Sequence, residues 1–445
     1  MTVDDAVNQA WQALGGGAHP AEPHFDPASI LPARLPVGDL ANATVAACAL
    51  AAAELAAARG RQLTGPILID PARVATAFVG ERHLRVDGRA FESFAPESAF
   101  FAAADGWVRT HANYPHHAER LRSVLGADVA AAIAALPAAE VEERVTAAGG
   151  LAVAVRRPEE WAAHEQGKAV ADLPLVAWRQ NPSPVRPPAP LPSGHLLPAT
   201  GLRVLDLTRV IAGPVATRAL AQFGAEVLRI DSPDLPEATA SHLDTGIGKR
   251  STLLDLGRAH DRAEFEELLA SADVVVTGYR PGSLDRFGLD PDALLERRPG
   301  LVVGRLSAWG TTGPWAGRRG FDSLVQAASG IAVIEGDDGR PGVLPAQALD
   351  HGTGYLLAAA VLRAIAAQLD GGGGYVVELA LARTAGWLTG LPTAAGGAAA
   401  ELAPSLGEVG GVTCAQPAVV LPGGLATWRA PARPWGGDPP AWDQI

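Results

Sequence analysis

Residues 201–231 read GLRVLDLTRVIAGPVATRALAQFGAEVLRID, and this stretch decides the fold. LRVLDL (202–207) is a short apolar run that suits a buried strand, and AEVLRID (225–231) is a second one. Between them, AGPVATRALAQFG (212–224) has the composition of a glycine turn that leads into a helix. This order predicts two parallel strands joined by a right-handed crossover.

The same alternation continues along the chain. We expect a helix near 261–271, a third strand at ADVVVT (272–277) and a fourth at LVVGRL (301–306). Strands that alternate with helices predict an α/β fold with a doubly wound, Rossmann-like parallel sheet. Such sheets bind ligands at the carboxyl ends of their strands, so the turn at 208–214 is the first candidate binding element.

The first 200 residues have weaker patterns. Alanine and leucine content predicts helices at 40–58 and 128–139, and 66–80 and 103–109 are predicted to be strand-like. A proline-rich run at 182–198 is typical of an extended linker.

These patterns predict a division into successive units. The expected units are an N-terminal segment (1–80), a small domain (81–181), a linker (182–198), a Rossmann-like domain (199–395) and a C-terminal tail (396–445). The tail is rich in Gly, Pro and Trp, so we expect it to lie along another unit.

Length, charge and cysteine content limit the class of protein. A chain of 445 residues is expected to form two or three packing units, and a net charge of −12 argues against nucleic-acid or polybasic membrane partners. Cys48 and Cys414 have no CxxC spacing, which predicts neither disulfides nor structural zinc and fits a reducing cytoplasm. The acidic N-terminus is unlike a signal peptide, and Ala43–Ala58 is expected to be a packed helix.

The turn after the first strand runs from Thr208 to Pro214. Gly213 permits close backbone approach, and the following helix offers its N-terminus to an anion. The turn contains neither GxGxxG nor a P-loop, so by itself it favours an ordinary βα connection.

Residues 201–231 resemble the opening of the family III CoA-transferases, the group that contains formyl-CoA transferase and the carnitine and bile-acid CoA-transferases. Four later stretches are similar to family blocks in the same order: IGKRSTLLDL (247–256), ADVVVTGYRPGSLDRFGLD (272–290), LSAWGTTGPWAGRRGFDSLVQAASG (306–330) and ALDHGTGYLLAAAVLRAI (348–365). The resemblance implies a Rossmann-like domain with a smaller α+β domain. It also implies CoA transfer between an acyl-CoA and a carboxylic acid, no metal, and a cytoplasmic homodimer of interlinked rings.

By its place in the last block, the resemblance implies that Asp350 is the catalytic nucleophile. The implied steps are a mixed anhydride, an aspartyl-CoA thioester and transfer to an acceptor carboxylate. Desolvation and precise placement improve a carboxylate as a nucleophile. Gly352, Thr353 and Gly354 leave room for an acyl group, and their N–H groups are expected to face an oxyanion. The alternative role for Asp350 is that of a helix N-cap.

The resemblance also predicts residues that contact CoA. They are Arg209, Val210, Ala212, Lys249, Arg250, Tyr279, Arg280, Arg286 and Arg319. Guanidinium and ammonium groups suit the diphosphate and 3′-phosphate of CoA, whereas the alternative for each cation is a solvated surface charge. Two positions depart from formyl-CoA transferase, because Gly278 stands in place of asparagine and Ser232 in place of a CoA-contacting arginine.

Asp322 is predicted to act as an acid, a base or a positioning group. Related racemases carry histidine at the position of Phe321 and need two acid/base groups, which a phenylalanine cannot supply. A CoA-ester racemase or isomerase is therefore the second hypothesis, and a non-catalytic CoA-binding or structural subunit is the third. The cluster His111–His117 lacks acidic or cysteine partners at ligand spacing, so no metal site is predicted there, and no GxSxG elbow is present.

Residues 31–55 resemble 344–369, which places Asp39 at the position of Asp350. Residues 80–185 resemble the family segment that leads into the small domain, so the usual order of the two halves is reversed. The segment headed by Asp39 lacks the following Gly-Thr-Gly. We therefore expect Asp350 to be reactive and Asp39 to be unreactive.

Overall fold

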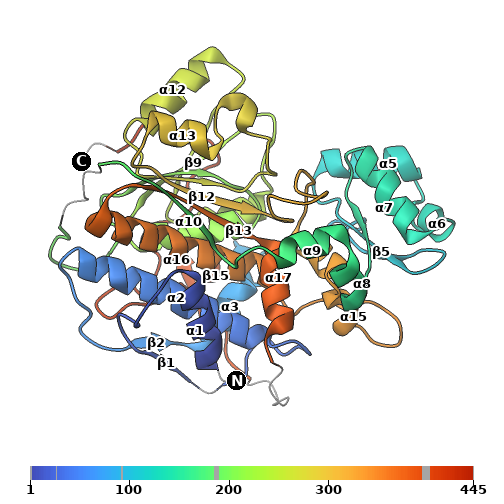
Figure 1. The fold of residues 1–445 in the computed structure, drawn as a ribbon, viewed down its shortest axis with the longest axis horizontal. Coiled ribbons are helices and arrows are strands. Elements are labelled where there is room, and N and C mark those ends of the chain that lie inside the picture. Colours follow the sequence, from blue (N-terminus) through green and yellow to red (C-terminus); the bar gives the residue numbers. More distant parts are fainter. Residues whose placement is uncertain (1–2, 27, 92–93, 185–189, 393–400, 444–445) are drawn as a thin grey trace.

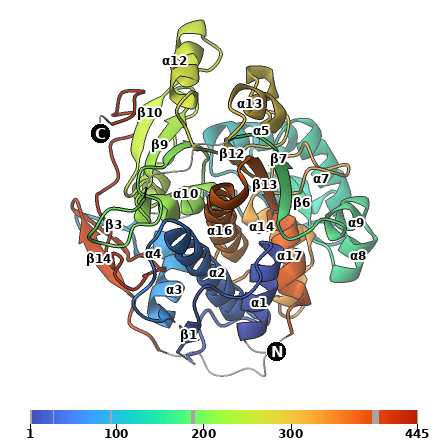
Figure 2. The ribbon, with the colours of Figure 1, turned by 60° about the vertical axis from the view of Figure 1, so that its left-hand side comes forward.

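The computed structural model describes residues 3–26, 28–91, 94–184, 190–392 and 401–443. Its central element is a seven-stranded sheet in the order β10-β9-β8-β11-β12-β13-β7 (Figures 1 and 2). The strands are β7 (Ala177–Asn181), β8 (Arg203–Leu207), β9 (Glu226–Asp231), β10 (Arg250–Leu253), β11 (Val274–Thr277), β12 (Val302–Ser307) and β13 (Gly374–Ala380). All neighbours are parallel except β13 and β7. The predicted α/β class with a parallel sheet is confirmed.

Alternating side chains of the strands enter two different cores. Val204, Val274 and Val276 point into one core with α10 (Ala212–Gln222) and α16 (Ala348–Gly371). Their sequence neighbours on the strands, among them Leu205 and Val275, point into the other core, under α12 (Ala259–Leu269) and α13 (Pro291–Arg297). Burial on both faces explains the near-continuous apolar runs that the sequence shows for these strands.

The first core also contains the N-terminal segment. Helix α2 (Val37–Ala58) packs along α16, and α1 (Val3–Ala13) packs on α2 (Figure 2). By length and composition α2 and α16 could each cross a membrane, but 89% and 83% of their most apolar windows are buried inside the fold. Ala43–Ala58 thus lies in a packed helix. Packing is continuous across the boundary expected at residue 80, because the N-terminal segment and the sheet share one core.

The small domain lies to one side of the main sheet (Figure 1). It contains the antiparallel strands β4 (Phe100–Ala102), β5 (Trp107–Thr110) and β6 (Ala152–Ala154), with helices α5 (Pro115–Leu125), α6 (Val129–Ala134) and α7 (Ala138–Ala147). Val108, Leu121 and Val141 belong to its separate hydrophobic core. Helices α8 (Pro158–Ala163) and α9 (Glu165–Ala171) connect it to β7.

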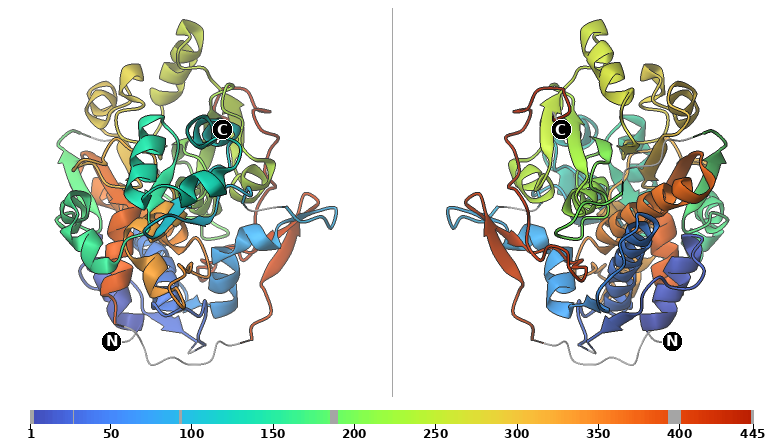
Figure 3. Two further views of the ribbon diagram at one scale, coloured as in Figure 1. Left: turned by 90° about the vertical axis from the view of Figure 1, so that its right-hand side faces the viewer. Right: turned by 90° about the vertical axis from the view of Figure 1, so that its left-hand side faces the viewer.

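The C-terminal tail pairs with the N-terminal part of the chain. Strands β14 (Leu406–Val409) and β15 (Val412–Ala415) form a sheet with β3 (Arg85–Val86), which projects from the body in Figure 3. Farther along, the backbone N–H of Ser251 donates to Asp438. The described part of the linker is held as well, because Arg61 donates to the carbonyls of Pro192 and Gly194. Residues 185–189 of the linker and 396–400 of the tail lie outside the described residues.

The remaining described elements are short or connect the larger ones. They are β1 (Pro23–Phe25), β2 (Ile67–Ile69), α3 (Pro71–Phe78), α4 (Gly80–His83), α11 (Thr239–Thr245), the 3-10 helix η1 (Asp285–Phe287), α14 (Asp322–Ala328), α15 (Ile331–Ile334) and α17 (Leu381–Gly390). Helix, strand and helix follow in the same order in α2–β2–α3 and in α16–β13–α17, which agrees with the repeat seen in the sequence.

Three local predictions were wrong in part. The strand predicted at 66–80 ends at Ile69, because Asp70 caps a helix by accepting bonds from the N–H groups of Ala72 and Arg73. The helix predicted at 128–139 is interrupted before Pro137 and becomes α6 and α7. The strand predicted at 103–109 begins only at Trp107, after a turn.

Candidate active site at the carboxyl ends of the sheet

The turn between β8 and α10 is built around the buried carboxylate of Asp206. This carboxylate accepts hydrogen bonds from the N–H of Thr208 (3.0 Å), the hydroxyl of Thr217 (2.6 Å) and Nζ of Lys249 (2.9 Å). Lys249 is only 3% exposed; burial lowers its pKa to about 8, although Asp206 opposes that effect. Lys249 therefore stabilises the turn through its bond to Asp206, and it does not line the cleft at the carboxyl ends of the strands.

The backbone of the turn is tightly constrained. Val210 has a φ of +71°, a conformation that costs energy for a β-branched residue and is often held in place at functional sites. A Cβ on Gly213 would lie 2.4 Å from the side chain of Thr208, so only glycine fits there. The result is a turn that presents Arg209 and Val210 to the cleft.

A cleft of about 760 Å³ opens at the carboxyl ends of the strands. Eight of the residues predicted from the sequence line it, namely Arg209, Val210, Ala212, Tyr279, Arg280, Arg286, Arg319 and Asp350. Arg250 is not among the lining residues. It lies on the edge strand β10, where it pairs with Glu226 (3.3 Å) and Asp443 (3.0 Å). The fold thus brings together residues from four separate sequence blocks.

Asp350 lies in the first turn of α16 and is 6% exposed. Its N–H donates to Oδ2 of the fully buried Asp322 (2.9 Å), which lies in the first turn of α14. Gln347, and not Asp350, holds the N-cap position of α16, and its side chain makes no capping hydrogen bond, so the N-cap role considered for Asp350 is absent. Within the described residues, no hydrogen bond reaches the carboxylate of Asp350. Asp350 thus lines the cleft with a carboxylate that has no hydrogen-bond partner among these residues.

Three carboxyl groups share this buried region. Burial, together with the charges of Asp322 and Glu81, holds the pKa of Asp350 well above its ordinary value. Burial also raises the pKa of Asp322 to about 6. The hydrogen bonds from the N–H of Asp350 and the amide of Gln326 lower this pKa in part, because they stabilise the charged carboxylate. Burial raises the pKa of Glu81, on α4, to about 7. Groups with such shifts are concentrated at functional sites.

His351 follows Asp350 and faces away from solvent. It is 1% exposed, its ring stacks on Phe78, and neither ring nitrogen has a hydrogen-bond partner within the described residues. Its Nε2 lies 4.0 Å from a carboxylate oxygen of Glu81. Burial lowers the pKa of His351 to about 3, so its ring is neutral near pH 7.

Gly352 and Gly354 serve packing instead of oxyanion binding. Both lie inside α16, where backbone N–H groups bond to carbonyls of the preceding turn, so the expectation for their N–H groups was wrong. A Cβ on Gly352 would lie 2.7 Å from Leu40 of α2, and a Cβ on Gly354 would lie 2.5 Å from the carbonyl of Ala212. The two glycines let α2 and α10 approach α16 closely.

The small domain contributes one wall of the cleft, with Tyr114, His116, His117 and Arg120. Tyr114 donates to Glu237 (2.6 Å), which also pairs with Arg209 (3.4 Å). Burial would raise the pKa of Glu237, but Arg209 and Arg229 overcome it and hold the value at about 2. This charged link joins the small domain to the turn after β8.

The histidine cluster of the small domain packs against the position where racemases carry a histidine. The ring of His111 stacks on Phe321 at 3.7 Å between centroids, and His117 meets Phe321 edge-on. Burial and neighbouring cations lower the pKa of His111 to about 3 and that of His117 to about 2. The rings are therefore neutral near pH 7. The only grouping with metal-ligand geometry in the described residues is elsewhere, at His260, Asp261 and Glu264.

Sequence reasoning missed Glu81 and the wall from the small domain. Glu81 lies in a short helix with no recognisable pattern, so nothing in the sequence marks it. Tyr114, His116 and His117 lie in the stretch HANYPHHAER, whose aromatic and basic content is the one local signal for this wall.

The sequence model of CoA-transferase family III matches residues 200–413. An acetyl-coenzyme A transferase, nodX, of Hypoxylon pulicicidum is 35% identical over 225 residues, which are 48% of this chain and 36% of that protein. The probable fatty acyl-CoA transferase Rv3272 of Mycobacterium tuberculosis is 34% identical over 198 residues, 41% of this chain and 50% of that protein. A succinate–glutarate CoA-transferase of Agrobacterium fabrum is 32% identical over 41% of this chain and 51% of its own length.

The crystal structure of Rv3272 is 36% identical over 44% of this chain and 56% of that one, with a TM-score of 0.42. The chain spans about half or less of the length of these curated relatives.

Proposed function

Because residues 200–413 match the sequence model of CoA-transferase family III, we propose that the chain transfers CoA between an acyl-CoA and a carboxylic acid, with Asp350 as the nucleophile. The observation that carries the proposal is the position of Asp350 in the cleft. Its carboxylate faces a cavity lined by several arginines, at the ligand-binding edge of a parallel sheet. The cytoplasm remains the expected location and a homodimer the expected assembly.

In the proposed reaction, a carboxylate oxygen of Asp350 attacks the thioester carbonyl, the C–S bond breaks, and CoA leaves as a thiolate. The thiolate then attacks the aspartyl carbonyl of the anhydride and releases the first acid as a carboxylate. The second acid attacks the carbonyl of the aspartyl thioester, displaces the thiolate and forms a second mixed anhydride. The thiolate then attacks the acyl carbonyl of this anhydride, which forms the new acyl-CoA and releases Asp350 as a carboxylate. Every step exchanges one C–O or C–S bond for another, so no oxidation state changes and no redox cofactor is required.

The surroundings of Asp350 support this role. Burial makes the carboxylate a stronger nucleophile once it is ionised, because fewer water molecules stabilise its charge. The N–H of Asp350 is fixed by Asp322, which sets the direction in which the side chain leaves the helix. Asp322 is therefore proposed as a positioning residue.

We assign the CoA nucleotide to the part of the cleft that Tyr279 and Arg286 line. Arg286 is exposed, lies over the ring of Phe287, and has no acidic partner within the described residues, so it is available to a phosphate. Tyr279 offers an aromatic face to the adenine, and Arg209 and the strained turn lie nearer to α10. Lys249 and Arg250, which are engaged elsewhere, are left out of this proposed CoA site.

A racemase or isomerase remains the second candidate because the cleft does contain an imidazole. His117 lines the same cleft as Asp350 and comes from the small domain instead of the position of Phe321. Its lowered pKa makes it a weak base, which favours CoA transfer.

The two functions are separated by incubating the chain with an acyl-CoA in D₂O, with and without a panel of carboxylic acids. CoA transfer predicts a new acyl-CoA only when an acid is present and no deuterium at the α-carbon. Deuterium incorporation without an acid would support the racemase instead. Absence of both, with CoA still bound, would support a non-catalytic subunit.

A further inference from the structure

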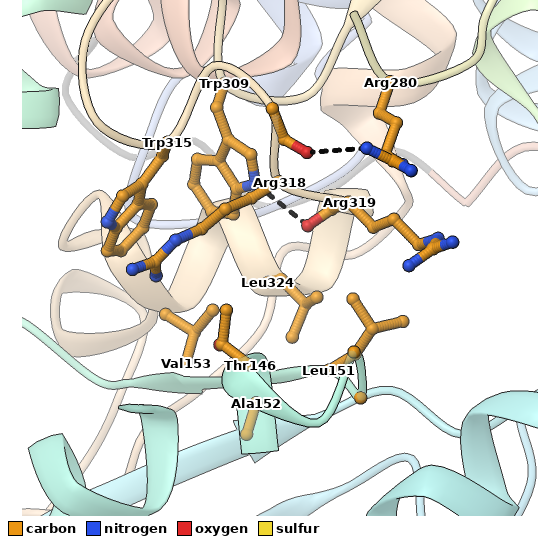
Figure 4. A pocket seen from close by; sticks show the side chains of 13 residues that line it. Thr146, Leu151, Ala152, Val153, Arg280, Trp309, Trp315, Arg318, Arg319 and Leu324 are labelled. Atoms are coloured by element: carbon orange, nitrogen blue, oxygen red, sulfur yellow. Dashed lines mark hydrogen bonds between the residues drawn. The ribbon is translucent and has the colours of Figure 1, made fainter. Parts of the chain in front are cut away.

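A second, smaller cavity of about 250 Å³ lies beside the cleft, between the small domain and residues 309–319 (Figure 4). Its apolar and aromatic surface comes from both domains, with Leu151, Val153, Trp309, Trp315 and Leu324. Thr146, at the end of α7, stands at its small-domain side.

The two cavities share a wall of arginines. Arg280, Arg318 and Arg319 line both of them. Arg120 lines the cleft and donates to the carbonyl of Gly149, which lines the second cavity (3.1 Å). The guanidinium groups therefore stand between the cavities and can serve an anion on either side.

This cationic cluster has little acidic compensation. Arg318 lies over the ring of Trp315 and 3.4 Å from Glu142, but no acid pairs with Arg280 or Arg319 within the described residues. Burial, together with the charges of Arg280 and Arg120, lowers the pKa of Arg319. Gathering cations without a counter-charge is unfavourable unless an anion binds there, and guanidinium groups bind carboxylates well.

The proposed reaction needs a separate binding site for the free acid. CoA remains in the cleft through both half-reactions, while one acid must leave and another must enter. The exchanging acid therefore needs a volume that CoA does not fill. The second cavity is smaller than the roughly 300–1,000 Å³ of pockets that hold drug-sized ligands, which limits it to a small acid. Its apolar floor suits a short carbon chain.

We propose that the second cavity is an entry site for the free carboxylic acid. The acid is a short-chain one, with its carboxylate on Arg318 and Arg319 and its carbon chain on Leu151 and Leu324. This inference rests on the proposed CoA transfer. It adds to it the class of acid that is accepted and the side from which the acid arrives.

The test places a carboxylate or a bulky ring in the cavity from its rim. Thr146 is half-buried at the end of α7, so Thr146→Glu and Thr146→Trp change the cavity with little effect on the core. Ala147 is the next residue, is exposed and lines neither cavity, which makes Ala147→Glu and Ala147→Trp matched controls. The probes are succinate and butanoate, with an acyl-CoA as donor.

We expect both Thr146 variants to raise the KM for the acid about tenfold or more, since a charge-assisted contact is lost or blocked. The KM for acyl-CoA should change less than twofold, and both Ala147 variants should match the parent chain. An unchanged KM for the acid in both Thr146 variants would overturn the inference. An equal rise in both KM values would overturn it too, by showing that CoA occupies the cavity.

Direct titration of succinate into the chain without CoA keeps this test independent of catalysis. If CoA transfer is not observed, succinate should still bind to the Ala147 variants and fail to bind to the Thr146 variants. Succinate binding of equal strength to all four variants would contradict the entry site, whatever the activity of the chain.

Discussion

The starts of helices α16 and α2 look alike in sequence but differ in their surroundings. Each is a long, alanine-rich helix with an aspartate in its first turn, and the two pack side by side in one core. Asp350 lies in the cleft with Asp322 and Glu81 close enough to shift its pKa. Asp39 lines none of the described cavities, and partial burial raises its pKa. Reactivity therefore depends on what other elements bring to the helix end.

The residues after each aspartate explain part of this difference. Asp350 is followed by His351-Gly352-Thr353-Gly354, and the two glycines allow α2 and α10 to lie against α16. Asp39 is followed by Leu40-Ala41-Asn42-Ala43, which contains no glycine, and Leu40 is the side chain that packs over Gly352. Asp350 lines the cleft at the carboxyl ends of the strands, whereas Asp39 does not.

The largest expected difference between the two helix ends follows from replacing each aspartate with asparagine. Asp350→Asn should lower the rate of CoA transfer about a thousandfold or more, because the nucleophile is lost. Asp39→Asn should change the rate less than twofold. Steady-state kinetics of the two variants measures both effects. Equal losses, or a larger loss for Asp39→Asn, would contradict the assignment.

A second prediction tests the nucleotide end of the cleft. Arg286→Ala should raise the KM for acyl-CoA about tenfold, since a charge-assisted bond to phosphate contributes about 1.5–3 kcal/mol. Arg262→Ala is the control, because Arg262 is exposed on α12 and lines none of the described cavities. The effect of Arg286→Ala should shrink in high salt. A KM that matches the control would place the phosphates elsewhere.

A third prediction concerns the pH dependence of the rate. Asp350 must be ionised to attack, and its pKa is raised, so activity should fall with decreasing pH well above the ordinary range of an aspartate. Glu81→Gln removes a negative charge near Asp350 and should lower its pKa, which moves the acid limb of kcat/KM to lower pH. Glu22 is exposed and distant from Asp350 in the sequence, so Glu22→Gln should leave the pH profile unchanged. An acid limb at the same pH in Glu81→Gln would show that Glu81 does not influence the pKa of Asp350.

The smallest expected effect is on stability. A carboxyl group whose pKa is raised in the folded chain stabilises the fold at low pH, and that contribution is lost as pH rises through the raised value. Asp350→Asn should therefore raise the melting temperature at pH 8 by roughly 1–4 °C, and the gain should shrink toward pH 4. Asp39→Asn should give a smaller gain. Thermal melts across this pH range measure the difference, and a lower melting temperature for Asp350→Asn at pH 8 would contradict it.

The sheet was predictable because most of its strands are short and largely apolar, and because helices of ordinary length separate them. LRVLDL and ADVVVT have the pattern typical of buried parallel strands, and in the structure they form β8 and β11, which pair with each other. The stretch at 66–80 was harder, because Asp70 and Pro71 begin a helix directly after three apolar residues. Local capping there outweighed the strand pattern.

The site was predictable only where one sequence block carries the residue. Asp350, Tyr279 and Arg286 lie in blocks that resemble the family, and all three line the cleft. Glu81, beside Asp350, and His117, in the wall of the cleft, come from segments far upstream of residue 201, and no local pattern in the sequence predicts that approach. The burial of Lys249 was equally hidden, because its partner Asp206 is contributed by another strand.

The central claim is that Asp350 forms the covalent intermediate and Asp39 does not. The most direct measurement incubates the chain with an acyl-CoA and hydroxylamine and maps the modified peptides by mass spectrometry. The account predicts a hydroxamate at Asp350, dependent on acyl-CoA and absent from the Asp350→Asn variant, with Asp39 unmodified. Modification of Asp39, or an active chain with no adduct at Asp350, would contradict it.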